Sequence, residues 1–146
     1  MEDNIQILDE FNKVIKMGED SYAMVIEKAT DLEFKNLLEE QSNAYEAFLT
    51  HLNTIYKELG ITPADTKISQ KFMGWTGIQM NTLTDTSNSH LSEMLIQGTT
   101  MGIISCTKIL NTNPNIKSSL KSMIHSFIDL QTRIANQLQP FLFLTN

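Results

Sequence analysis

Residues 88–110 read NSHLSEMLIQGTTMGIISCTKIL, and their apolar side chains recur with helical period on two faces. One face is centred on Gly98 and forms an ordinary core stripe. The other carries Ile96, Ile103 and Ile104. A helix that is apolar on two faces must be covered on both, by helices of its own chain or by a second subunit. We therefore expect the central helix of a bundle, with these core positions: Leu91, Met94, Leu95, Met101, Ser105 and Ile109.

The composition is that of one soluble globular domain. The chain has 146 residues, of which 41% are hydrophobic and 19% are charged, a balance typical of a protein with a single core. No apolar run approaches the roughly 20 residues that a membrane-spanning helix needs. We therefore expect a single domain over residues 1–146, with no membrane partner.

Charge and cysteine content indicate the compartment and argue against one class of partner. The acidic start MEDNIQ leads directly into an amphipathic pattern, unlike a secretory signal. The lone Cys106 permits no intrachain disulfide, and at the border of the core stripe it is expected to be a buried, inert thiol. These features predict a cytoplasmic protein.

A net charge of −6 and a single arginine, Arg133, argue against nucleic-acid binding.

Three further segments carry the sequence marks of helices. Apolar residues recur with helical period over residues 4–29. The capping box Thr30-Asp31-Leu32-Glu33, with its threonine as the expected cap, starts a second helix that ends at Gly60. The pair Asn113-Pro114 signals the start of a last helix, which ends near Pro140.

A connection over about residues 61–87 separates the two helical hairpins. Thr62-Pro63 signals a short or broken helix within it. So long a connection allows the single-crossover arrangement of ferritin-like folds. We predict an all-α, ferritin-like up-down four-helix bundle with a long, partly helical crossover between helices 2 and 3. The expected crossover residues that cover the three isoleucines of the central helix are Phe72, Trp75 and Ile78.

Several local features occur together in this chain. They are the segment Gly18-Glu19-Asp20-Ser21-Tyr22, the Leu59-Gly60 stop followed by Pro63, Trp75 in the connection, and the last helix after Pro114. With them the chain resembles, over nearly its whole length, the bacterial ferritin-like bundles of unknown function. Ten lysines against one arginine fit a clostridial-type member. Relatives of such bundles include spore-coat-type proteins, so the resemblance implies a spore- or stress-associated role.

Ferritin-like folds often hold two metal ions. Two helices each supply a glutamate, and the other two each supply a Glu-x-x-His motif. None of the ten glutamates here has histidine three residues on, and the nearest match is Glu40-Gln41-Ser42-Asn43. The expected inward positions at mid-helix are Gly18, Gln41, Gly98 and Phe127. A dinuclear site needs anionic oxygen ligands. We therefore expect no metal and no cofactor.

Two histidines have a carboxylate at helical spacing. His90 and Glu93 stand three residues apart, and His125 and Asp129 four, which is compatible with a surface metal. Solvated polar pairs are the favoured interpretation.

No catalytic triad, phosphate loop or acid pair is present, so no enzyme is predicted. The main alternative is a dimetal oxidase or iron-handling protein with atypical ligands.

Gly18 and Gly98 are expected at about the same height in the bundle, where they remove side-chain volume. Either aromatic residues pack inward there, which is favoured, or a cavity is left for an apolar ligand, as in a small-ligand carrier. Gln41 is expected to be hydrogen-bonded to Tyr22 or Gln131. The candidate cavity lining is Gly18, Tyr22, Gln41, Tyr45, Gly98 and Phe127.

The tail Pro140-Phe141-Leu142-Phe143-Leu144 is too apolar for a free end and should dock on its own bundle or on a neighbour. We therefore predict a non-catalytic structural or partner-binding protein that binds another protein or forms a homodimer. The candidate association surface is Ile96, Ile103, Ile104, Phe141 and Phe143.

Overall fold

The computed structural model of the chain describes residues 2–63 and 84–144. Within these ranges the chain is all-helical, which confirms the predicted all-α class and its four long helices. None of the described helices is long and apolar enough to cross a membrane. The elements are α1 (Glu2–Lys28), α2 (Leu32–Leu59), α4 (Asn88–Thr112), α5 (Ser118–Leu138) and a short 3₁₀-helix, η1 (Gln139–Phe141).

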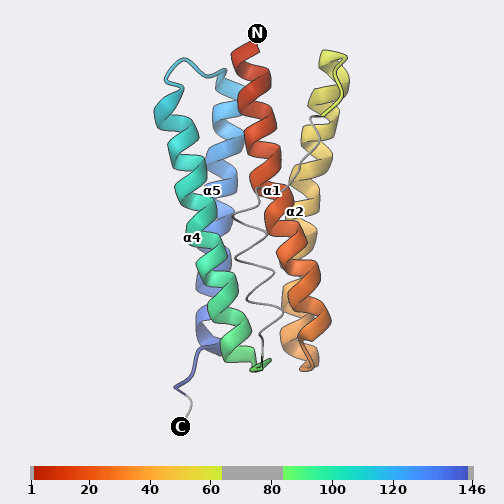
Figure 1. Cartoon of the computed structure of the whole chain (residues 1–146), viewed down its shortest axis with the longest axis vertical. Coiled ribbons are helices and arrows are strands. Elements are labelled where there is room, and N and C mark those ends of the chain that lie inside the picture. Colours follow the sequence, from red (N-terminus) through yellow and green to blue (C-terminus); the bar gives the residue numbers. More distant parts are fainter. Residues whose placement is uncertain (1, 64–83, 145–146) are drawn as a thin grey trace.

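The four long helices lie side by side as a bundle, with α1 and α4 in front of α2 and α5 in the view of Figure 1. The backbones pack closely between α1 and α2, α1 and α4, and α4 and α5. Helices α2 and α4 both start at the end where the chain terminates, so they run in the same direction. Residues 64–83, with Phe72, Trp75 and Ile78, lie outside the described residues. The crossover and its cover of the central helix therefore stay predictions.

The end of α2 and the start of α4 agree with the sequence, whereas the N-cap of α2 is displaced by one residue from the predicted position. Gly60 ends α2 in the left-handed conformation, with a φ of 68°, which confirms the predicted stop. The cap of α2 is Asp31 and not Thr30, because the Asp31 carboxylate accepts the Phe34 N–H at 2.9 Å. Ser87 caps α4 by accepting the His90 N–H at 3.2 Å.

The prediction that the last helix starts with the cap-and-proline pair Asn113-Pro114 was wrong. The helix begins at Ser118. Asn113 instead serves the end of α4, because its side-chain amide donates to the Ile109 carbonyl at 2.8 Å. Its own carbonyl accepts the Ile116 N–H at 3.2 Å, which closes a turn between the two helices.

The buried stripe of α4 is rotated from the predicted one in the second half of the helix. Gly102 and Cys106 are buried there, whereas Ser105 is half-buried and Met101 is 37% exposed. Thr99 is also buried. The reason is that α4 packs against α5 as well as α1, so the buried face turns toward the helix that follows it.

The three isoleucines expected on a second face of α4 lie in different surroundings. Ile96 packs against the core and Ile103 is half-buried, whereas Ile104 is 49% exposed. They therefore do not share one uniformly covered face among the described residues.

Gly18 and Gly98 differ in what a side chain would meet at each position. A Cβ built on Gly18 would lie 2.6 Å from Cε1 of Tyr45, whereas one on Gly98 would have no atom of residues 2–63 and 84–144 within 4 Å. The Tyr45 ring thus occupies the space left by Gly18, as the favoured interpretation predicted, whereas no described residue fills the space beside Gly98.

The two glycines should respond oppositely to alanine. Gly98→Ala should raise the free energy of unfolding by about 0.5–1 kcal/mol, because alanine favours helix and its Cβ meets no atom of the described residues. Gly18→Ala should lower it by about 1–2 kcal/mol, because overpacking against the buried ring outweighs that gain. Chemical denaturation of both variants measures the difference. A stabilised Gly18→Ala variant would contradict the close contact with Tyr45.

Candidate functional site

The polar centre of the bundle contains a chain of neutral hydrogen bonds. Tyr22 on α1 donates its hydroxyl to Oε1 of Gln41 on α2 at 2.9 Å. Nε2 of Gln41 in turn donates to Oε1 of Gln137 on α5 at 3.0 Å. The predicted bond between Tyr22 and Gln41 is confirmed. The series links three helices without a charged group.

A second tyrosine–glutamine pair lies beside the first. Tyr45 on α2 donates its hydroxyl to Oε1 of Gln131 on α5 at 2.8 Å. The Tyr45 ring also contacts the rings of Tyr22 and Phe127, with centroid distances of 5.2 Å and 5.5 Å. Gln131, which the sequence left as an alternative partner of Gln41, therefore bonds to Tyr45. Aromatic packing and hydrogen bonding together hold α1, α2 and α5.

Burial keeps these ionisable groups in their neutral forms. Loss of solvation raises the pKa of Tyr22 and Tyr45 well above the ordinary tyrosine value. Cys106 is buried, as predicted, and burial raises the pKa of its thiol to about 12. A thiol needs to be deprotonated to act as a nucleophile. None of these three groups is therefore suited to act as a base or nucleophile near neutral pH.

Two buried polar atoms have no hydrogen-bond partner among the described residues. They are Oγ of Ser92 and Nε2 of Gln131. An unsatisfied buried polar group typically costs about 1–3 kcal/mol. Reversing the Gln131 amide would leave its oxygen without a partner instead, so one of its two polar atoms stays unsatisfied in either orientation.

A cavity of about 50 Å³ lies between α1 and α4 and extends toward the two tyrosines. Five of the six residues expected to line a cavity do line it, whereas Gln41 does not. Residues outside the predicted set also contribute, among them Thr99, Met101 and Gln131. The predicted lining residues that the cavity brings together are Gly18, Tyr22, Tyr45, Gly98 and Phe127.

Sequence reasoning missed two polar contacts of the bundle. Gln137 was not singled out, although it lies six residues after Gln131 on α5. Tyr56 is buried and donates its hydroxyl to a carboxylate oxygen of Asp9. The burial of Tyr56 could have been predicted from the sequence, because Tyr56 follows Leu52 by four residues on the core stripe of α2.

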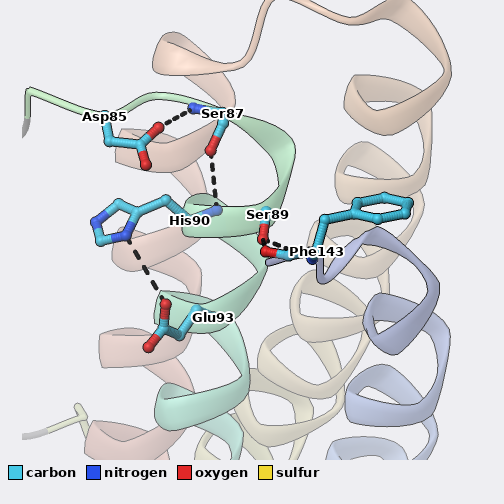
Figure 2. A network of polar contacts seen from close by, with 6 residues as sticks. All are labelled: Asp85, Ser87, Ser89, His90, Glu93 and Phe143. Atoms are coloured by element: carbon cyan, nitrogen blue, oxygen red, sulfur yellow. Dashed lines mark hydrogen bonds and ion pairs between the residues drawn. The ribbon is translucent and has the colours of Figure 1, made fainter. Parts of the chain in front are cut away.

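The two candidate surface pairs of histidine and carboxylate are not joined into one site. His90 and Glu93 lie 3.9 Å apart between Nδ1 and Oε2 (Figure 2). His125 and Asp129 are both exposed on α5. In residues 2–63 and 84–144 no group of three or more histidine, cysteine, aspartate or glutamate side chains could hold a metal ion.

The apolar tail lies against its own bundle. The Ser89 hydroxyl accepts the Phe143 N–H at 2.9 Å and donates to the Phe143 carbonyl at 3.1 Å, as Figure 2 shows at the first turn of α4. The ring of Phe141 packs on that of Phe34 at 4.9 Å. The exposed fractions of Phe143 and Leu144 are nevertheless 73% and 101%. The tail is anchored through its backbone and leaves two large side chains in water.

The candidate association residues fall into two separate groups. Ile104 follows Ser89 by 15 residues on α4, which corresponds to about 22 Å along a helix. Phe143, held at Ser89, therefore lies far from Ile104. The tail and the α4 isoleucines do not form one continuous patch.

Replacing Gln41 tests the polar centre. Gln41→Leu should lower the free energy of unfolding by about 1–3 kcal/mol, because the buried Tyr22 hydroxyl loses its acceptor. Tyr22→Phe should cost less, and a double-mutant cycle between the two should show a positive coupling energy. A Gln41→Leu protein that is more stable than the unmodified protein would show that the bonds contribute nothing.

Alkaline pH should destabilise the fold. The pKa of Tyr22, Tyr45 and Tyr56 is raised in the folded state, so the unfolded chain loses these protons first. The stabilisation is fully present below the unfolded tyrosine pKa of about 10 and is lost as pH rises above it. Denaturation at pH 8 to 11 measures this, and Tyr45→Phe should give a shallower decline. Parallel declines would exclude Tyr45 as a contributor.

Comparison of the chain with family models, curated proteins and solved structures gives no match.

Proposed function

We propose that this chain is a non-catalytic, ferritin-like helical bundle without a dimetal carboxylate site. It acts by association, as a structural or partner-binding protein, and forms a homodimer through the end of the bundle that carries the tail. The parallel direction of α2 and α4 supports the ferritin-like arrangement, because an up-down bundle with a single crossover has this feature. A spore- or stress-associated role fits a protein that works by assembly.

The observation that carries this proposal is the presentation of the tail. Two hydrogen bonds to Ser89 satisfy the backbone polar groups of Phe143, while the side chains of Phe143 and Leu144 lie in solvent. Burial of a large apolar side chain contributes about 1.5–3 kcal/mol. An ordered backbone with exposed apolar side chains loses less entropy on binding than a free tail does.

A further exposed leucine extends the apolar character of this end. Leu32, in the first turn of α2, is 71% exposed. The start of α2 and the carboxyl end of the chain lie at the same end of the bundle (Figure 1). A twofold dimer would place the same side chains of both copies against one another. We therefore assign the second copy of this chain as the first partner of this surface.

The chemistry of the bundle centre supports a role without catalysis. The inward positions hold phenols and amides, and the tyrosine pKa values are raised. Such groups do not supply the anionic ligands of a dinuclear metal site. The dimetal oxidase alternative would require ligands from elsewhere in the chain.

The test replaces the exposed side chains and keeps the tail backbone. Phe143→Ser combined with Leu144→Ser should shift the protein from dimer to monomer in sedimentation velocity, with an unchanged melting temperature of the dilute protein. Ile104→Asp is the matched control, because it removes an exposed apolar side chain about 22 Å along α4. It should leave the dimer intact.

Two results would overturn the proposal. One is a chain that stays monomeric over the whole accessible concentration range. The other is a dimer that resists the tail variant and dissociates with Ile104→Asp, which would move the interface to α4.

A further inference from the structure

A second, larger pocket lies at the end of the bundle opposite the tail, where α1 and α5 begin and α2 ends (Figure 1). Its volume is about 550 Å³, within the roughly 300–1,000 Å³ that small-molecule sites occupy. Its lining residues come from these three helices. The pocket is therefore separate from the surface assigned to the dimer and from the cavity between α1 and α4.

The inner wall of this pocket is apolar and its mouth opens to solvent. Leu8 on α1 and Leu120 and Met123 on α5 line it and are each 7% exposed or less. On the α2 side, Ile55 is half-buried and Leu59 is 45% exposed. A molecule that enters from solvent would cover apolar surface that Ile55 and Leu59 now leave in water.

The mouth of the pocket carries opposite charges on two helices. Lys117, at the start of α5, and Glu58, at the end of α2, both line it and are exposed. Neither belongs to an ion pair within the described part of the chain. The remaining ionisable lining residue is His51, on α2. The α5 side of the mouth therefore attracts an anionic group, and the carboxylate on the α2 side attracts a cationic one.

The first turn of α5 strengthens the positive side. Lys117 forms no side-chain cap for this helix. The backbone N–H of Ser119, which also lines the pocket, has no partner within its own helix at this position. An anionic group beside Lys117 would thus meet a cation and a backbone donor together.

We propose that this pocket binds a free α-amino acid with a large apolar side chain. The carboxylate of the amino acid pairs with Lys117, its ammonium group pairs with Glu58, and its side chain lies against Leu8, Leu120 and Met123. A ligand with both charges next to an apolar group matches both sides of the mouth. A fatty acid would leave Glu58 without a counter-charge, and an apolar amine would leave Lys117 without one.

The experiment titrates the full chain with L-phenylalanine at low salt, where exposed charges are least screened, and follows amide and methyl signals by NMR. We expect saturable shifts around the pocket and contacts between the phenyl ring and the methyl group of Met123. N-acetyl-L-phenylalanine lacks the ammonium group and L-phenylalanine amide lacks the carboxylate. Each should bind about fivefold more weakly, because each loses one exposed ion pair. These two probes resemble the last and the first residue of a peptide, so they also distinguish a free amino acid from the end of a protein chain.

Four variants assign the two charges. Lys117→Gln should weaken the binding of L-phenylalanine about fivefold and leave that of L-phenylalanine amide unchanged, because the amide has no carboxylate to pair. Glu58→Gln should have the same effect on L-phenylalanine and leave that of N-acetyl-L-phenylalanine unchanged. Lys121→Gln on α5 and Glu46→Gln on α2 are the matched controls, because both residues are exposed and neither lines the pocket. Melting temperatures establish that all four variants are folded.

Three results would overturn the proposal. The first is the absence of saturable shifts, which is also the outcome if another segment of the chain or a second copy fills the pocket. The second is equal binding of L-phenylalanine and its two derivatives. The third is an equal effect of Lys117→Gln and Lys121→Gln. Because the pocket and the tail lie at opposite ends of the bundle, failure here and failure of the dimer proposal are separate outcomes.

Discussion

The contact of the Tyr45 ring with Gly18 determines how the centre of the bundle is built. The ring can lie against α1 only because residue 18 has no Cβ, and from there its hydroxyl reaches Gln131 on α5. Its edge-to-face contact with Phe127 adds a second link to α5. The backbones of α2 and α5 come close at few points, so large side chains such as these bridge the two helices. One residue thus joins three helices.

The same contact explains why the cavity is small and neutral. The ring fills the space of Gly18, but no side chain of the described residues fills the space beside Gly98, and the cavity lies on that side. The groups near it are phenols and amides, which can be buried at lower cost than carboxylates when they are paired. Tyr22 and Tyr45 each donate to a glutamine oxygen, and the burial that excludes water from them also raises the pKa of both hydroxyls.

The sequence predicted one-sided helices well and the two-sided helix less well. On α5 the apolar side chains recur on one face, and those at helical spacing from Leu120 to Leu138 are buried. On α4 apolar residues surround much of the helix, so the pattern alone does not fix its rotation, and Gly102 replaces Met101 in the core.

Asn113 shows a second limit, because an asparagine can cap the helix before it or the one after it. Likewise two tyrosines and three glutamines allow several pairings, and only the packing of Tyr45 on Gly18 selects one.

Among the described residues, the tail and the wall of the cavity both contain groups without an interaction partner. The groups are apolar at the tail and polar at the cavity. At the tail the polar groups of Phe143 are satisfied by Ser89 while its side chain is exposed. At the cavity the apolar groups are buried while one polar atom of Gln131 has no partner among the described residues. Exposed apolar side chains are covered by the apolar surface of a partner, whereas an unpaired buried donor lowers the stability of the fold. Under the proposed function, a second copy of the chain therefore binds at the tail, because it would bury the side chain of Phe143 and leave the two backbone bonds to Ser89 in place.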